Sequence, residues 1–349
     1  MLRVDKSSNK ALHKKKLEFK SIGFTALEAA TRKPQKMLLE PLIKEGEAVM
    51  IYAASGLGKS FYSMGLAVAM ATGTEFIGYQ APKALRVKYI DGEMSKYDLM
   101  TRIQANIGNR CSNNQFMKSL NSNLLISNRE LCTSQNVDYP DIGNESHIDI
   151  VIDELVREKV EVVVFDNYST LALGIEDENS AGSFNITLEL VMRLKALGIV
   201  PIVVHHANKT GKAYRGTTKI EAVFSSIIGL HRDSSVDVAL GAGFTIKFDK
   251  NRSSYNPLLE TRTVQCLQQE EPVWVEVESE AAKYIEVIEA LRTLEFTSQE
   301  ALADSLGITQ GAVSKRIKKA IANDYINKQK VDELWELAKQ EVADSEPDF

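Results

Sequence analysis

The sequence has few of the features that organise secreted or membrane proteins. Its three cysteines, Cys111, Cys132 and Cys266, form no Cys-x-x-Cys pair and no zinc-ligand spacing, which excludes a disulfide framework and is typical of a reducing cytosol. The longest apolar run, around "MGLAVAMA", is too short to span a bilayer. The opening "MLRVDKSSNKALHKKKLEFK" has no apolar stretch of a secretory signal. We therefore expect a bacterial-type cytoplasmic protein with no membrane partner.

An excess of positive charge is also missing. The 349 residues have a formal net charge of -5, which argues against a protein that coats polyanions over its whole surface. Any contact with nucleic acid should come from local basic surfaces or from a lined channel. With 44% hydrophobic residues, a chain of this length can bury one large core and leave a small second module.

Alternating apolar segments predict an α/β core. The expected strands are "EAVMIYA", "ALRVKYID", "VEVVVFD" and "IVPIVVHH", and the expected helices follow Gly58 and lie near residues 97–107 and 184–197. This alternation predicts a mostly parallel sheet with helices on both faces. Residues 109–146 are rich in Asn and Ser, and we expect them to hold one strand, "NLLIS", inside surface loops.

Changes in composition divide the chain into four segments. Residues 1–35 are polar and lysine-rich, and we expect a flexible arm. A cluster of glutamates followed by the helical pattern "AAKYIEVIEALRTL" indicates a boundary near residue 279. The core then spans residues 36–278, a small helical unit spans 279–330, and 331–349 form an acidic tail. The tail has a helical apolar stripe, composed of Val331, Leu334, Trp335 and Ala338.

The segment "AASGLGKS", Ala53 to Ser60, matches the spacing of a phosphate-binding loop between a strand and a helix. Glycines allow the backbone N–H groups to turn toward the phosphates, and the helix N-terminus adds a positive end. Lys59 would contact the β and γ phosphates, and the Ser60 hydroxyl would ligate Mg²⁺. The predicted ATP-binding residues are Ser55, Gly56, Leu57, Gly58, Lys59 and Ser60.

Carboxylates follow two of the predicted strands. Asp166 ends "VEVVVFD", where it can hold a water on Mg²⁺. Glu93 lies just after "VKYID", at the tip of a neighbouring strand, which suits a base that polarises the attacking water. Asp91 is the competing candidate for that base, and its alternative role is to cap the turn.

The order of "ASGLGKS", "YIDGEM", "VVVFDN", "VVHHANKTG", "RGTTK" and "KFDKNR" resembles RecA-like ATPases, and most closely the hexameric helicases of plasmid RepA and bacterial DnaB type. The resemblance covers about residues 36–255. It implies a RecA-like core in which Glu93 activates water, Asp166 binds Mg²⁺ and His206 couples the γ-phosphate to DNA-binding loops. Lys209, Lys212 and Arg215 then lie in loops that line a ring channel and contact single-stranded DNA. "GIEDENSAG" resembles an interface loop.

Two cations, Lys250 and Arg252, end the strand "FTIKFDKNR". As part of the last core strand, they would project from the edge opposite their own phosphate loop and face a neighbouring subunit. They resemble the Lys-x-Arg element that RecA-like rings insert into the adjacent site. There Arg252 would neutralise charge on the γ-phosphate and Lys250 would assist. A solvated strand end is the alternative.

The segment "TSQEALADSLGITQGAVSKRIKKAIANDYI" predicts a helix-turn-helix or winged-helix unit, capped by Ser298 or Thr297, with small Ala303 at the helix crossing and a turn at Gly307. On its second helix, Val313, Ile317 and Ala320 form an apolar face. The opposite face would contact duplex DNA through Gln310, Ser314, Lys315 and Lys318. Protein docking is the alternative role of this unit.

Taken with the resemblance, these features predict an ATP- and Mg²⁺-dependent DNA helicase or translocase of RepA type. It would act as a homohexameric ring in the replication of a plasmid, phage or mobile element. An initiator or regulatory ATPase that switches assembly without unwinding DNA is the alternative. The absence of the separate primase-binding domain of DnaB-type helicases keeps that alternative open, and a DNA-repair recombinase is a third.

Overall fold

The computed structural model describes residues 21–32, 34–173, 184–208, 211, 213–214, 221–237, 239, 241–268, 272–323 and 325–345. The chain divides into two units, Met1–Lys36 and Met37–Phe349. The first contains a short helix, α1 (Phe24–Ala30), where the sequence predicted only a flexible arm. Within the described ranges, none of the helices combines the length and the hydrophobicity that a membrane span requires.

A nine-stranded sheet forms the centre of the second unit, in the order β13-β12-β11-β10-β3-β9-β8-β6-β7. The pairs from β7 to β10 are parallel, and the pairs from β10 to β13 are antiparallel. This confirms the predicted mostly parallel α/β core. The strands are β3 (Val49–Ala53), β6 (Val87–Asp91), β7 (Leu124–Asn128), β8 (Val162–Asp166), β9 (Val200–His206), β10 (Ser226–His231), β11 (Gly243–Asn251), β12 (Arg262–Gln268) and β13 (Pro272–Val277).

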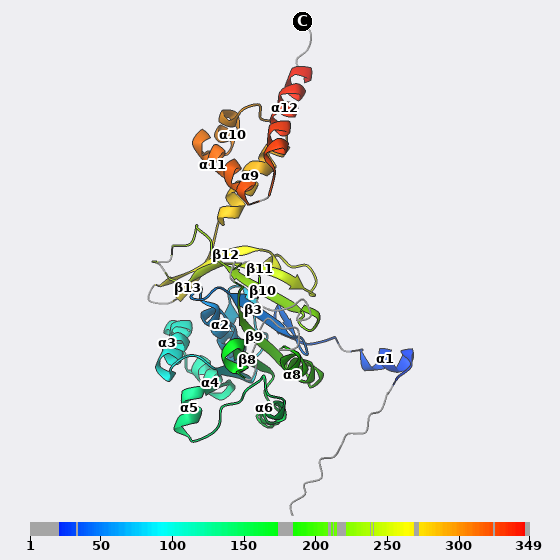
Figure 1. The fold of residues 1–349 in the computed structure, drawn as a ribbon, viewed down its shortest axis with the longest axis vertical. Helices are drawn as coiled ribbons and strands as arrows, with labels where there is room; N and C mark the ends of the chain where they lie inside the picture. The colour runs from blue at the N-terminus through cyan, green and yellow to red at the C-terminus, as the bar shows by residue number, and fades with distance from the viewer. Residues whose placement is uncertain are drawn as a thin grey trace, which may run out of the picture. The chain divides into compact units, whose positions relative to one another are not determined.

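Helices cover both faces of the parallel part of the sheet (Figure 1). One face packs against α2 (Lys59–Thr72), α3 (Lys96–Ile107) and α4 (Asn114–Asn123), and the other against α6 (Glu145–Arg157) and α8 (Asn185–Ala196). Along β3, Ile51 belongs to the first hydrophobic cluster, whereas Met50 and Tyr52 belong to the second. Burial on both faces explains why these strands are continuous apolar runs rather than alternating ones.

Shorter elements complete the core. Two small antiparallel pairs lie outside the main sheet. The elements are β1 (Met37–Leu39), β2 (Ile43–Lys44), β4 (Glu75–Phe76), β5 (Tyr79–Gln80), the helices α5 (Arg129–Ser134) and α7 (Tyr168–Leu171), and the 3₁₀ turns η1 (Gly108–Ser112) and η3 (Pro257–Leu259).

The prediction of surface loops for residues 109–146 was wrong, although the expected strand is present as β7. Asn113, Asn128 and Asn144 each accept backbone N–H groups at the start of α4, α5 and α6, respectively. Asparagine is one of the preferred N-cap residues, because its side chain satisfies donors that the first helical turn leaves unpaired. The asparagines that suggested loops therefore mark helix starts.

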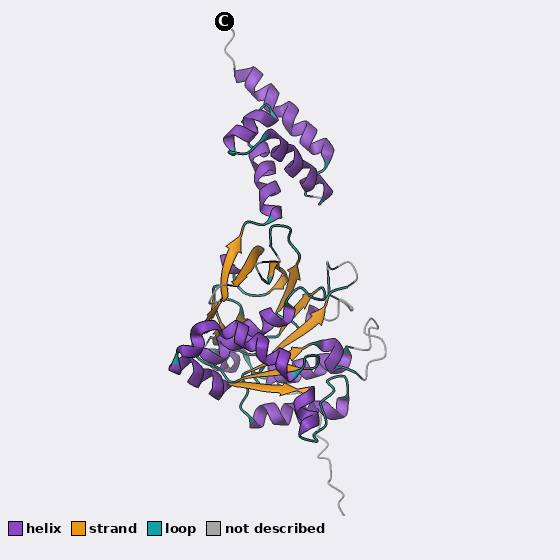
Figure 2. Ribbon diagram, turned by 90° about the vertical axis from the view of Figure 1, so that its left-hand side faces the viewer, coloured by secondary structure: helices purple, strands orange, loops and turns teal. Residues whose placement is uncertain are grey.

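The C-terminal part consists of four helices, α9 (Glu280–Arg292), α10 (Gln299–Ser305), α11 (Gln310–Ala322) and α12 (Lys328–Ser345) (Figure 2). Ser298 caps α10 through its side chain, and Gly307, with φ of 64°, allows the turn before α11. The predicted apolar face of α11 is buried. The helical stripe predicted for the acidic tail lies on α12, where Val331 and Leu334 bury against the same helical core.

Candidate active site

The phosphate-binding loop has the backbone geometry of an anion site. Gly56 and Gly58 have φ angles of 76° and 96°, which glycine adopts without steric cost. α2 then starts at Lys59, and no side chain caps its first turn. The N–H groups of that turn and the positive end of the helix are therefore available to a phosphate.

The carboxyl ends of the central strands meet at the same edge as this loop. In the register of the sheet, Ala53 lies opposite His206, and Asp91 lies opposite Asp166. The predicted loop, sensor and carboxylates are thus brought together from four strands. In open α/β sheets, ligands bind at this edge.

Asp166 is almost completely buried at the end of β8. Tyr89 donates a hydrogen bond of 2.5 Å to its Oδ2, and Ser63 lies 2.9 Å from the Tyr89 hydroxyl. Burial raises the pKa of Asp166, and this effect is opposed by hydrogen bonds from Tyr89 and Ser60 and by the charge of Lys59. The carboxylate therefore lies beside both the loop lysine and the loop serine.

Lys59 is itself buried, with 7% of its surface exposed. Burial lowers its pKa, and the nearby carboxylates of Asp166 and Glu93 act in the opposite direction. A buried ammonium group between two acids is a suitable contact for a phosphate.

Glu93 lies on the turn after β6, where Asn167 donates a hydrogen bond from Nδ2 to its Oε2 over 2.6 Å. Asn167 is fully buried and directly follows Asp166. Glu93 also lines a cavity of about 290 Å³, together with Ser55, Gly56, Gly58, Lys59 and Ser60. The two sequence candidates, loop and glutamate, therefore border one space.

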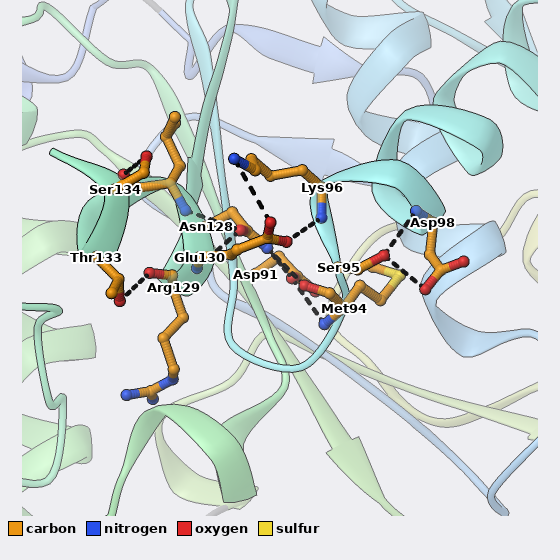
Figure 3. Close-up of polar contacts among 11 residues, drawn as sticks. Asp91, Met94, Ser95, Lys96, Asp98, Asn128, Arg129, Glu130, Thr133 and Ser134 are labelled. Atoms are coloured by element: carbon orange, nitrogen blue, oxygen red, sulfur yellow. Dashed lines mark hydrogen bonds and ion pairs between the residues drawn. The ribbon is translucent and has the colours of Figure 1, made fainter.

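Asp91, the competing candidate for the base, lines the same cavity, and its Oδ2 supports the turn (Figure 3). Its Oδ2 accepts hydrogen bonds from the Met94 backbone at 2.9 Å and from Asn128 Nδ2 at 2.8 Å. Asp91 is 1% exposed, and burial raises its pKa to about 6, with the charge of Asp166 adding to the effect. These contacts match the turn-capping alternative.

Among the lining residues of this cavity that sequence reasoning missed are Arg102 and Cys266. Arg102 lies on α3, the helix that follows Glu93, so a cation in the early turns of that helix was an available signal. Cys266 comes from β12, and only the folding of the antiparallel strands brings it there. All three cysteines are free thiols.

Lys250 and Arg252 lie at the amino ends of the parallel strands, the end of the sheet opposite the loop. The start of β11 is beside the loop, since a Cβ added at Gly58 would be 3.5 Å from Phe244. β11 then runs antiparallel to β10, so that Lys250 is opposite Ile227 and the Arg252 N–H donates to Ser225. β10 pairs with β3 from Val49 to Ala53, where the loop begins. At roughly 3.3 Å per residue, Val49 lies about 13 Å from that end of the strand.

The two cations bind the backbone of the turn at residues 221–223. Lys250 donates to the Glu221 carbonyl, and Arg252 donates to the Ala222 carbonyl at 3.5 Å. A third cation, Lys195 of α8, was missed by sequence reasoning and donates to the Val223 carbonyl at 2.7 Å. Burial followed by the neighbouring charge of Arg252 lowers the pKa of both lysines. Each cation therefore raises the positive potential around the others.

The sequence model of an AAA domain family matches residues 13–212, more than half of the chain. The chain belongs to this family. Its α/β core carries the phosphate-binding loop after β3, and β9 separates β3 from β8, the strand that ends in Asp166.

Solved structures similar to this AAA domain protein include the flagellar accessory protein FlaH of Methanocaldococcus jannaschii. It is 14% identical, with a TM-score of 0.42, and the match covers 66% of this chain and 90% of that one. A KaiC-like protein of Pyrococcus horikoshii is 16% identical, with a TM-score of 0.43, and coverage of 68% and 93%. No curated protein matches the sequence.

The predicted DNA-contacting residues of this AAA domain protein fall into two groups. Lys209, Lys212 and Arg215 lie outside the described residues, as does the expected interface loop at residues 174–182. On α11, the predicted face is accessible, with Lys315 and Lys318 exposed. The other two cations of α11 pair with α9, Arg316 with Glu286 at 3.0 Å and Lys319 with Glu280 at 2.6 Å.

Proposed function

We propose that this AAA domain protein is an ATP-driven DNA helicase or translocase of RepA type, which acts as a homohexameric ring in the replication of a plasmid, phage or mobile element. The observation that carries the proposal is the position of Lys250 and Arg252 at the sheet edge opposite the loop. Cations placed there serve the γ-phosphate of a neighbouring subunit rather than their own.

Within one subunit, the loop holds the phosphates of ATP. The backbone donors around Gly56 and Gly58 and the ammonium group of Lys59 neutralise their charge. Asp166 and the Ser60 hydroxyl fit a magnesium site, since a buried carboxylate lies beside a hydroxyl at the carboxyl end of a strand. Mg²⁺ held by these two residues would supply positive charge that offsets the charge of the phosphates.

Glu93 is the base that orients the attacking water. Its hydrogen bond from Asn167 fixes the carboxylate beside Asp166 while leaving Oε1 for the water. The described residues contain no cluster of three or more His, Cys, Asp or Glu side chains that could hold a metal ion. In this proposal, Asp166 acts on the metal and Glu93 acts on the water.

Hydrolysis is completed across the subunit boundary. Arg252 of one subunit neutralises the charge that develops on the γ-phosphate of the next, and Lys250 assists. Among the described residues, the hydrogen bonds of both side chains go to the backbone carbonyls of Glu221 and Ala222. A phosphate could replace these uncharged partners. A site shared head-to-tail between identical subunits is compatible with the closed ring that we propose.

Two parts of the chain would contact DNA, the residues that follow β9 and the face of α11. We infer that His206, adjacent to Ala53 in the sheet, senses the γ-phosphate and couples it to the residues after β9, where Lys209, Lys212 and Arg215 would contact single-stranded DNA. The exposed face of α11, with Gln310, Ser314, Lys315 and Lys318, would contact duplex DNA.

The test of the shared site mixes two inactive variants. Arg252→Ala should bind ATP normally but hydrolyse it roughly 10³–10⁵-fold more slowly, and Lys59→Ala should lose nucleotide affinity. In mixed rings, some interfaces combine an intact loop with an intact arginine, so part of the ATPase activity should return. Mixed oligomers, confirmed by native mass spectrometry, that remain inactive would show that Arg252 acts in cis or structurally.

A second assay separates the motor from the initiator ATPase. Wild-type protein with ATP should unwind a forked DNA substrate, and Glu93→Gln should not. Robust DNA-stimulated hydrolysis without unwinding on any fork polarity would favour an assembly switch instead.

A further inference from the structure

A second cavity, of about 470 Å³, lies between the C-terminal end of α3, the β4–β5 hairpin and the strands β12 and β13. Its polar and aromatic lining includes Arg262, Asn106, Arg110, Glu75, Glu276 and Trp274. It shares no lining residue with the nucleotide cavity. Its volume is in the range of small-molecule sites.

Two side chains in its wall are buried with unused hydrogen-bonding atoms. Arg262 is 8% exposed and Asn106 is 4% exposed. Arg262 Nε and Asn106 Oδ1 have no hydrogen-bond partner among the described residues. Buried polar atoms in folded proteins are nearly always paired, so these two indicate a missing donor and a missing acceptor.

Arg262 also forms no ion pair among the described residues. Its guanidinium donates to the Ile77 carbonyl at 2.6 Å and lies over the Tyr79 ring, 4.9 Å from the centroid. No carboxylate within the described part of the chain forms an ion pair with it. A buried cation that is not ion-paired is costly, which favours an anionic ligand, although Glu75 and Glu276 line the same cavity.

We propose that this cavity binds a small organic anion that also offers an N–H donor, such as a nucleoside monophosphate or an amino acid. Its phosphate or carboxylate contacts Arg262, and its N–H group donates to Asn106 Oδ1. The exposed carboxylates Glu75 and Glu276 line the same cavity and disfavour ligands that carry only negative charge.

The ligand would affect ATP hydrolysis through α3. Asn106 Nδ2 donates to the Arg102 carbonyl at 3.0 Å, and Arg102 lines the nucleotide cavity. Trp274 contacts Phe61, a wall residue of the nucleotide cavity, with ring centroids 5.8 Å apart. Because coupling between two sites is reciprocal, saturation with an ATP analogue should change the affinity for the anion.

The chain offers an intrinsic probe, since Trp274 and Trp335 are its two tryptophans. In the Trp335→Phe variant, all tryptophan fluorescence comes from Trp274. We would first saturate the nucleotide cavity with a non-hydrolysable ATP analogue and Mg²⁺, and then titrate AMP, L-glutamate or inorganic phosphate. AMP or glutamate should give a saturable change, at a lower concentration than phosphate, and the effective probe identifies the ligand class.

Arg262→Gln and Asn106→Asp should each weaken that binding about tenfold or more, because one removes the cation and the other adds a negative charge. Lys118→Gln, which removes an exposed cation of α4, is the matched control and should bind normally. If Arg262→Gln does not fold, Arg110→Gln and Asn106→Asp still test the site. Failure of both AMP and glutamate to saturate, or unchanged binding in Asn106→Asp, would overturn the proposal while leaving the ATPase function untouched.

Discussion

Asn167 donates a 2.6 Å hydrogen bond to Glu93, so the residue that follows the buried Asp166 holds the carboxylate of the neighbouring strand end. The backbone supports the same arrangement, since the Gly92 N–H donates to the Asp166 carbonyl at 2.8 Å. The proposed metal ligand and the proposed base are therefore fixed relative to one another by adjacent strands of the sheet.

Replacing Glu93 by Gln should retain ATP binding and reduce turnover by roughly 10²–10⁴-fold, because the amide cannot accept the proton of the attacking water. Steady-state ATPase rates and equilibrium binding of a fluorescent ATP analogue measure the two effects. The control is Arg86→Gln, which removes a cation that does not line the nucleotide cavity. A normal rate in Glu93→Gln would assign the base to another residue.

Replacing Lys59 by Ala should weaken ATP binding by about 1.5–3 kcal/mol, the usual contribution of a hydrogen bond to a charged group. Calorimetric titration measures the change, and Lys83→Ala, which removes an exposed lysine paired with Glu161, should bind as the wild type does. Because burial lowers the pKa of Lys59, wild-type affinity should begin to fall at a lower alkaline pH than an ordinary lysine would allow. Undiminished binding in Lys59→Ala would contradict the assignment.

Replacing Asp91 by Asn should stabilise the fold increasingly as the pH rises from about 4 to about 6. Burial raises the folded pKa of Asp91 to about 6 from the ordinary value of 3.8, so the folded state binds a proton that the unfolded state has released. Stability from this group is present below the unfolded pKa and is lost as the pH rises through the folded pKa. The difference in the free energy of unfolding between the variant and the wild type should reach up to about 3 kcal/mol, at 1.36 kcal/mol per pKa unit.

Urea unfolding at pH 4 and pH 7 measures this gap. Asparagine can keep the two hydrogen bonds that Asp91 Oδ2 accepts, from Met94 and Asn128, so the turn should persist. An equal stability difference at both pH values would show that Asp91 does not titrate as expected.

Replacing both Lys315 and Lys318 by Ala should weaken duplex binding and reduce its salt dependence by about two in the log–log slope, one for each lost phosphate contact. The matched control changes Lys330 and Lys339, two lysines of α12 that pair with Glu333 and Glu336. Titrations of labelled duplex at several salt concentrations provide the measurement. Identical slopes in both double variants would reassign this face of α11 to protein docking.

The sequence alone determined the elements whose chemistry is local. The loop from Ala53 to Ser60 was recognisable because its function depends on glycine conformations and on adjacent residues. Continuous apolar runs identified the four central strands, since both faces of those strands are buried. Caps and a left-handed glycine likewise placed α10 and α11.

Tertiary structure decided what depends on contacts between distant segments. It turned the asparagines of residues 109–146 into helix caps, which composition alone could not distinguish from loop residues. It gave Asp91 and Glu93 different partners, although both line the nucleotide cavity and are two residues apart: Asn128 binds Asp91, and Asn167 binds Glu93. It also brought Arg262 and Asn106 together around a cavity from opposite ends of the core, a juxtaposition that no local pattern encodes.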